Sequence, residues 1–218
     1  MTKSSPRHIV WDWNGTLLDD NHAVVSAVNS VCTLFDREHI DIDEWRAIYS
    51  RPLRACYEQL LRREITEDDW ARVDELYHVA YRELLDSCGM AEGVPHVLQD
   101  WAHAGGSQSL LSMWFHDELV ELVTARGLRE LFDRMDGLRT SVGGGSKDEH
   151  LRAHLKVQEL DPAEVVLIGD VLDDARAAEQ AGARCVLVTT GVMDRAKLEK
   201  SGHPVVDSIP EAIKLINA

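Results

Sequence analysis

Apolar residues recur along the chain with two spacings, one typical of buried strands and the other of amphipathic helices. Ile9, Val10 and Trp11 form a short run of β-branched and aromatic residues, which is typical of a buried parallel strand. Residues 165–168 form the strongest run of this kind. Further strand candidates lie at residues 108–112, 137–140, 184–188 and 205–206. Helical patterns separate these runs, which predicts an α/β fold with a Rossmann-like parallel sheet.

Residues 20–88 follow the helical spacing, with apolar side chains every three or four positions. Val24, Val28 and Val31 fall on one face of the first predicted helix. Thr66 is expected to cap the longest helix, whose first turn is acidic. The pattern predicts four helices, the first containing residues 24–35 and the others over about 43–49, 53–61 and 67–85.

These four helices would form an insertion between the first strand and the rest of the α/β pattern. Beyond them, strand-like and helical segments alternate again, with helices expected over about 94–104, 116–125 and 175–181. We therefore expect a core domain of residues 1–18 and 91–218 and an all-helical cap domain of residues 19–90. The two crossings between the domains, near residues 17–20 and 89–93, would act as hinges.

A run of three glycines at residues 143–145 predicts a flexible loop in the second half of the chain. Ser146 follows, with Glu149 three residues later. This spacing predicts a capping box, in which each side chain bonds the backbone N–H of the other residue. Lys147 would then stand at the start of a helix.

Composition and charge restrict the partners of the chain. Its 218 residues carry a net charge of −15 without a basic stripe, which argues against nucleic acid and anionic membranes as partners. No segment is long and apolar enough to span a bilayer, and residues 1–7 are polar, so we expect a cytoplasmic protein. Cys32, Cys56, Cys88 and Cys185 lack CxxC spacing and are expected to be buried free thiols. The sequence does not indicate an oligomeric state.

The first strand ends in a carboxylate and a tight turn. Asp12 follows the apolar run directly, so its side chain is expected at the carboxyl end of a central strand, where open α/β sheets bind ligands. Gly15 allows the backbone to turn, and Thr16 places a hydroxyl beside the carboxylate. Such an aspartate can act as a nucleophile, although the pattern also fits an ordinary exit from a strand.

A second predicted strand end carries several acids. Residues 165–168 lead into Asp170, and Asp173 and Asp174 follow before an alanine-rich helix. Asp170 and Asp174 could meet Asp12 at one edge of the sheet and form an all-oxygen site, which suits Mg²⁺. Alternatively, the acids only cap the helix, where negative charge is favoured. A cap needs a single acid, so the three acids favour the metal site.

Together these motifs resemble the haloacid dehalogenase superfamily of phosphatases and phosphotransferases, in particular its phosphoglycolate-phosphatase-like members with a helical C1-type cap. Residues 12–17, DWNGTL, are similar to the first motif of that family, and residues 169–174, GDVLDD, are similar to the fourth. The resemblance implies a Mg²⁺-dependent phosphatase that hydrolyses a small phosphorylated metabolite through an aspartyl-phosphate on Asp12. It also implies the metal ligands, which are Asp12, Asn14 through its backbone carbonyl, Asp170 and Asp174.

The resemblance further implies groups that hold the substrate. Ser112, at the end of an apolar strand, resembles the hydroxyl of the second motif that binds the phosphoryl group, and Thr16 would contact the same group. Lys147 resembles the cation of the third motif, which neutralises the nucleophile and the transferring phosphoryl group. In the predicted cap, Arg51 and Arg54 flank a break between helices, where their donors could hold a substrate carboxylate or phosphate.

Asn14 departs from the family pattern, because phosphatases of this family usually have an aspartate there that protonates the leaving group. An amide cannot donate that proton, which predicts a slow hydrolase, a substrate with a good leaving group, or a protein that binds a phosphorylated ligand without hydrolysing it. His22 is a candidate replacement base. A haloacid dehalogenase-like reaction, which needs no metal, is a further alternative that Asp170 and Asp174 argue against.

Overall fold

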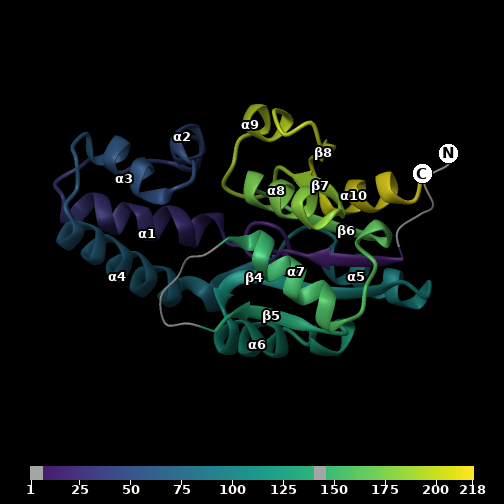
Figure 1. The fold of residues 1–218 in the computed structure, drawn as a ribbon. Helices are drawn as coiled ribbons and strands as arrows, with labels where there is room; N and C mark the ends of the chain where they lie inside the picture. Colours follow the sequence, from purple (N-terminus) through teal and green to yellow (C-terminus); the bar gives the residue numbers. More distant parts are fainter. Residues whose placement is uncertain (1–6, 140–145) are drawn as a thin grey trace.

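The protein is organised around one parallel sheet, seen in a computed structural model that describes residues 7–139 and 146–218 (Figure 1). Its strands are β1 (His8–Trp11), β4 (Ser107–Phe115), β5 (Met135–Leu138), β6 (Val165–Gly169), β7 (Arg184–Val188) and β8 (Val205–Val206). They lie in the order β5-β4-β1-β6-β7-β8, and all neighbouring pairs are parallel. This confirms the predicted α/β fold with a Rossmann-like sheet. The polar residues 1–6 and the predicted glycine loop at 143–145 lie outside the described residues.

The register of the central strands brings two strand ends to the same edge of the sheet. In β1, Trp11 pairs with Ile168 of β6 on one side and with Leu110 of β4 on the other. The residues that follow β1 and β6 therefore emerge side by side. Trp11 and Ile168 are fully buried, as expected for strands covered on both faces.

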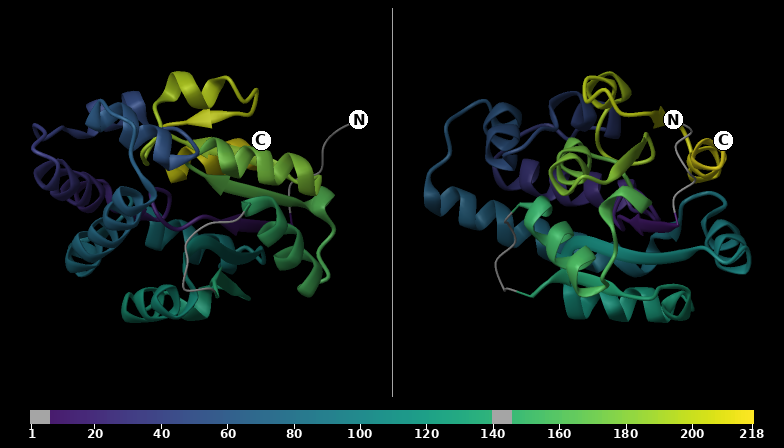
Figure 2. Two further views of the ribbon diagram at one scale, coloured as in Figure 1. Left: turned by 60° about the vertical axis from the view of Figure 1, so that its left-hand side comes forward. Right: turned by 45° about the vertical axis from the view of Figure 1, so that its right-hand side comes forward.

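Helices cover both faces of the sheet (Figure 2). They are α5 (Val94–His103), α6 (His116–Ala125), α7 (Lys147–Val157), α8 (Leu172–Ala181), α9 (Arg195–Glu199) and α10 (Ile209–Ile216). Helices α7 and α8 contact each other, and so do α5 and α10. The predicted capping box at the start of α7 is wrong, because the Ser146 side chain makes no cap hydrogen bond with a described residue. The Ser146 carbonyl instead accepts from the backbone N–H of Glu149, at 3.2 Å.

The predicted helical insertion is present as α1 (Asn21–Leu34), α2 (Ile42–Ile48), α3 (Leu53–Leu61) and α4 (Glu67–Leu84). Helices α1 and α4 pack side by side at the left of Figure 1. Thr66 caps α4 as expected, since its hydroxyl accepts from the N–H of Asp69 and its own N–H donates to the Asp69 carboxylate. The four helices are called the cap below, and the division into cap and core domains stays a prediction.

The chain passes between sheet and cap through two short strands, β2 (Leu18–Asp19) and β3 (Gly89–Met90). They pair with each other in antiparallel orientation, so both crossings run side by side. A second connection is made by Lys197 of α9, whose ammonium donates to the carbonyls of Arg46, Ala47 and Tyr49 at 2.7, 2.7 and 2.9 Å. These carbonyls stand at the carboxyl end of α2, where a cation is favoured.

Two further findings on the described residues concern the cysteines and the length of the apolar helices. The four cysteines lie in its described part as buried free thiols, as predicted. No helix formed by residues 7–139 and 146–218 combines the length and the apolar character needed to cross a membrane.

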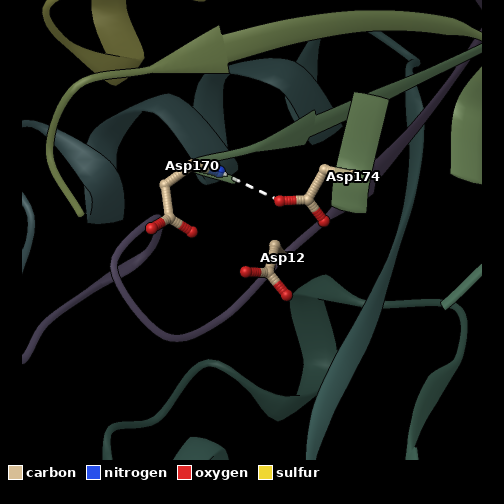
Figure 3. A group of neighbouring side chains, drawn as sticks. All are labelled: Asp12, Asp170 and Asp174. Atoms are coloured by element: carbon tan, nitrogen blue, oxygen red, sulfur yellow. Dashed lines mark hydrogen bonds between the residues drawn. The ribbon is translucent and has the colours of Figure 1, made fainter. Parts of the chain in front are cut away.

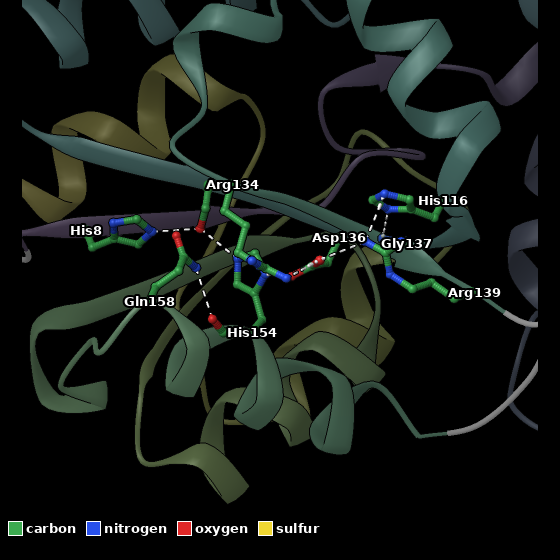
Figure 4. Close-up of polar contacts among 9 residues, drawn as sticks. His8, His116, Arg134, Asp136, Gly137, Arg139, His154 and Gln158 are labelled. Carbon is green, nitrogen blue, oxygen red and sulfur yellow. Dashed lines mark hydrogen bonds and ion pairs between the residues drawn. The ribbon is translucent and has the colours of Figure 1, made fainter.

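A buried polar network ties β1, β4, β5 and α7 together, away from the carboxyl ends of the strands (Figure 4). The Ser109 hydroxyl lies 2.7 Å from His8 Nε2 and 2.8 Å from His154 Nε2. His154 Nδ1 lies 2.7 Å from Asp136, which also accepts from Arg134 at 2.5 Å. Burial lowers the pKa of His8 to about 4. Burial alone would raise the pKa of Asp136, but hydrogen bonds from His154 and Arg134 outweigh it and lower that pKa to about 2.

The His8 environment predicts a loss of stability in mild acid. Because the pKa of His8 is about 4 in the folded protein and 6.5 in an unfolded chain, the unfolded chain binds the proton first as the pH falls. Protonation linked to His8 should therefore lower the free energy of unfolding by about 3 kcal/mol between pH 7 and pH 4. Urea unfolding at several pH values should show this slope for the native protein and a flatter one for His8→Gln. Parallel slopes for the two proteins would contradict the prediction.

Candidate active site

The site begins where β1 ends. The Asp12 N–H donates to the Ile168 carbonyl at 2.9 Å, so the strand pairing continues to Asp12 and fixes its position beside β6. Asp12 is 7% exposed. Gly15 then turns the chain with a φ of +70°, and a Cβ there would stand 2.6 Å from Asp170 Oδ2. Glycine is required here both for the left-handed backbone and for this close approach.

Three carboxylates and one lysine meet at this edge. Asp12, Asp170 and Asp174 each offer an oxygen, and the three atoms lie within 4.8 Å of one another (Figure 3). Lys147 Nζ donates to Asp12 Oδ1 at 2.6 Å and forms a second, short ion pair with Asp174. The sheet topology thus brings together four residues that the sequence predicted for one site. Lys147 is only 4% exposed, because it enters this cluster from the first turn of α7.

Asp174 holds the loop as well as the lysine. Its Oδ2 accepts from the N–H groups of Asp170 and Val171, both at 3.1 Å, while its Oδ1 faces Lys147. A Cβ at Gly169 would stand 2.3 Å from Asp174 Oδ2, so the strand must end in glycine for this carboxylate to fit. Asp174 therefore satisfies backbone donors at the start of α8, as the capping alternative proposed, and also belongs to the acidic cluster.

The cluster holds more negative than positive charge. Burial raises the pKa of Asp170 well above its ordinary value, and repulsion from Asp12 adds to the shift. Burial also raises the pKa of Asp12 to about 6, although Lys147 opposes this. The pKa of Lys147 is raised despite its burial, because Asp12 and Asp174 stabilise its charge. One ammonium does not compensate the charge of three buried carboxylates, so a bound cation would be favoured in this cluster.

The Asn14 amide forms a hydrogen-bonded group with a tyrosine from the cap. Its Nδ2 donates to Tyr81 Oη at 2.7 Å and to Asp20 Oδ2 at 3.2 Å, and its Oδ1 accepts from Ser112 at 3.2 Å. The Tyr81 hydroxyl donates to the same Asp20 oxygen at 2.5 Å, and the Gly15 N–H donates to the other at 2.9 Å. The side chain of Asn14 is thus held in place by partners from both the core and the cap.

Sequence reasoning missed Asp20 and Tyr81. Asp20 is 1% exposed, and burial raises its pKa. Its place three residues after the first motif was a signal that an acid there could turn back toward Asn14. Tyr81 gave no such signal, because it is one aromatic residue in an amphipathic helix. Only the tertiary fold, in which its ring packs 5.1 Å from the ring of Trp114 in β4, places its hydroxyl here.

The two hydroxyls predicted to hold substrate lie in different surroundings. Ser112 stands at the cavity, where its Oγ accepts from the Trp114 N–H at 3.0 Å and donates to Asn14. Thr16 is fully buried and donates to Asp170 Oδ1 at 3.3 Å. The structure therefore places Thr16 against a predicted metal ligand and outside the cavity wall.

The two predicted arginines and the candidate base have partners other than Asp12. Arg51 lines the cavity with its Nε 3.6 Å from Asp173 Oδ2, and Arg54 lines it while ion-paired with two glutamates. Both stay predicted substrate contacts. His22 is exposed outside the cavity wall, with its Nε2 3.0 Å from Ser87 Oγ, so it does not face Asp12.

The cluster opens into a cavity of about 730 Å³ between sheet and cap. One end of the cavity is lined by Asp12, Asn14, Ser112, Lys147 and Asp170. The aromatic residues that the cap contributes are Trp45, Tyr49, Tyr57, Trp70, Tyr77 and Tyr81. A ligand in this cavity would contact the charged cluster and an aromatic wall at the same time.

Comparisons with known proteins agree with this architecture. The model of a family described as haloacid dehalogenase-like hydrolase matches residues 9–188. A phosphoglycolate phosphatase of Caulobacter vibrioides is 26% identical over 84% of this chain and 79% of its own length. Phosphoglycolate phosphatase 1 of Pseudomonas aeruginosa is 24% identical over 95% and 76%. The solved structure of a predicted phosphatase from Clostridium acetobutylicum has a TM-score of 0.83 at 18% identity, covering 98% of this chain and 99% of that one.

Proposed function

Because the chain belongs to the haloacid dehalogenase-like hydrolase family, we propose that it is a Mg²⁺-dependent phosphatase of a small phosphorylated metabolite. The observation that carries this proposal is the cluster in which Lys147 contacts Asp12 beside Asp170 and Asp174 at the end of a cavity. The relatives named phosphoglycolate phosphatase support a phosphomonoester as the substrate class.

In this proposal Asp12 is the nucleophile. One of its carboxylate oxygens attacks phosphorus, the bond from phosphorus to the alcohol oxygen breaks, and water then hydrolyses the aspartyl-phosphate to aspartate and phosphate. Lys147 holds the attacking carboxylate and neutralises charge on the phosphoryl oxygens. The Ser112 hydroxyl would donate a hydrogen bond to the phosphoryl group. The departing alkoxide needs a proton, which Asn14 cannot supply.

The donor set fits Mg²⁺, a cation that prefers oxygen ligands. Asp12, Asp170 and the Asn14 carbonyl would hold the ion. Asp174 was predicted as a ligand too, but its oxygens already face Lys147 and two backbone N–H groups, so we propose that it positions Lys147 and the loop. When bound, Mg²⁺ would stabilise the negative charge of the transferring phosphoryl group.

This function predicts that hydrolysis depends on Mg²⁺ and on Asp170. Asp170→Asn should lower phosphate release by at least about 10²-fold, because a neutral amide replaces a charged ligand of a hard cation. Addition of EDTA should lower the activity of the native protein to a similar level. Phosphate release from a panel of phosphomonoesters, with Mg²⁺ and with EDTA, measures both effects.

The matched control is Glu179→Gln, which removes one charge from the exposed face of α8, the helix that follows Asp170, and should retain activity. Activity that persists after both EDTA and Asp170→Asn would favour the metal-independent, dehalogenase-like alternative.

A second candidate function is binding of a phosphorylated ligand without turnover. It is favoured by Asn14, whose amide donates to Tyr81 and Asp20 and has no proton to give a leaving group. The two candidates differ in whether Asp12 becomes phosphorylated. A slow enzyme forms a phosphate on Asp12 that either accumulates or turns over. A binder shows saturable ligand binding and no Mg²⁺-dependent phosphate release.

A further inference from the structure

The cavity is large for phosphoglycolate, the compound in the names of two relatives of this chain. Its volume of about 730 Å³ lies in the range of pockets that enclose drug-sized ligands, roughly 300–1,000 Å³. A phosphoryl group at Asp12 and Lys147 would occupy only the end nearest the sheet. The alcohol part of the substrate would occupy the remainder, between the cap helices.

Helix α4 supplies an aromatic wall for that remainder. Trp70, Val73, Tyr77 and Tyr81 recur every three or four residues, so they share one face of the helix, and all of them line the cavity. Trp70 packs against Tyr57 with ring centroids 6.0 Å apart, and Tyr77 stacks on Tyr81 at 5.7 Å with an interplanar angle of 10°. Trp70 and Tyr77 are half-buried, and both line the cavity in which a ligand would lie.

The charges along the wall disfavour a second anionic group on the substrate. Among the described residues, every lysine and arginine that lines the cavity is ion-paired with a carboxylate; they are Arg51, Arg54, Lys147 and Arg176. The wall also carries the carboxylates of Asp20 and Asp74. A carboxylate on the alcohol part, as in phosphoglycolate, would have to compete with these protein carboxylates for an arginine or lysine.

From these observations we infer that the substrate is a phosphomonoester whose alcohol part ends in a flat, uncharged ring, an arylalkyl or heteroarylalkyl phosphate. The ring lies against Trp70 and Tyr77, and the phosphate lies at Asp12 and Lys147. Offset or edge-to-face contact with rigid aromatic rings favours a flat group over an aliphatic one of equal size. The inference rests on the proposed phosphatase function for the position of the phosphate.

The test measures binding with ligands that cannot be hydrolysed, so that it does not depend on turnover. Isothermal titration in Mg²⁺ would compare 3-phenylpropylphosphonate, 3-cyclohexylpropylphosphonate, propylphosphonate and 3-phosphonopropionate. We expect the phenyl compound to bind roughly 10- to 100-fold more tightly than the propyl compound, the cyclohexyl compound to lie between them, and the carboxylate to bind most weakly. Equal affinities for phenyl and propyl, equal affinities for phenyl and cyclohexyl, or tightest binding of the carboxylate would each overturn the inference.

Variants of α4 locate the ring. Trp70→Leu and Tyr77→Leu, which keep apolar bulk but remove the flat surface, should each lower the preference for phenyl over propyl several-fold, and Trp70→Phe should restore most of it. Val79→Ala, on the exposed side of the same helix, should leave the preference unchanged. Circular dichroism confirms which variants are folded. A preference that survives in both leucine variants would contradict the assigned position.

Kinetics on the matching phosphate esters separates the inference from the proposed function. Hydrolysis of none of them would refute the phosphatase proposal, while the phosphonate series would still decide the ring preference. Hydrolysis of all of them at equal kcat/KM would retain the phosphatase and refute the preference.

Discussion

Asp12→Asn should lower phosphate release by at least about 10⁴-fold, because the amide cannot form the aspartyl-phosphate. The same variant should be at least as stable as the native protein in the absence of Mg²⁺. Burial raises the pKa of Asp12 to about 6, so the carboxyl binds its proton more tightly in the folded than in the unfolded state. The charged form therefore opposes folding above pH 6, and its removal relieves repulsion from Asp170 and Asp174.

Phosphate release and the Tm, both at pH 7.5, measure the two halves of this prediction. Asp12→Glu is the companion variant, because it keeps the charge but displaces the carboxylate by one methylene, and it should also lose turnover. Acid-quenched native protein should carry phosphate on the peptide that contains Asp12. More than a few per cent of residual activity in Asp12→Asn would exclude Asp12 as the nucleophile, and a large fall in Tm would mean that its contact with Lys147 is mainly structural.

Asn14→Asp should raise turnover of alkyl phosphates by roughly 10²- to 10⁴-fold, which is the usual range of general acid catalysis. The new carboxyl would lie two residues from the nucleophile, where it could protonate the leaving oxygen and later accept a proton from water. The gain should be small for p-nitrophenyl phosphate, since its leaving group hardly needs protonation.

The structure adds a condition to this prediction. Asn14 Nδ2 lies 3.2 Å from Asp20 Oδ2, so an aspartate at this position would face a second buried carboxyl. Two such groups cannot both ionise readily, and the pair should retain one proton near neutral pH, which is the state that a general acid requires. In the double variant Asn14→Asp, Asp20→Asn this repulsion is removed, so the alkaline limb of the pH–rate profile should move to lower pH.

Initial rates on ethyl phosphate and p-nitrophenyl phosphate across pH 5–9 would measure these effects. Asn-Gly sequences are prone to deamidation, and a trace of native protein converted to aspartate at residue 14 would mimic weak activity, so peptide mass analysis must precede the kinetics. An equal gain on both substrates, or none on either, would contradict the missing-acid explanation.

The parts of the site that could be predicted are those in which local pattern and sheet topology act together. An apolar run that ends in Asp12, and another that ends before Asp170, identify two strand ends, and a parallel sheet brings neighbouring strand ends to one edge. Lys147 was assigned by family resemblance, because a position at a helix start does not by itself indicate that the side chain turns inward, and the structure buries it beside Asp12.

Contacts between the cap and the sheet could not be predicted, because they depend on how two separately patterned regions pack. The aromatic residues of α4 have the spacing of any amphipathic helix, and the sequence does not distinguish a ring that faces a cavity from one that packs in a core. In the same way, the sequence does not distinguish Lys197 from other surface lysines, and only the fold places its ammonium at the carbonyls that end α2.

The position of β1 in the middle of the sheet has a consequence for synthesis of the chain on the ribosome. The cap helices that follow β1 contact one another within residues 21–84, so they can pack early. Among the strands that the structure describes, however, the partners of the apolar strand His8–Trp11 are β4 and β6, and β6 ends at Gly169. A nascent chain with a complete cap therefore still carries this strand unpaired, and chaperones that recognise apolar segments should bind it until the second half of the protein emerges.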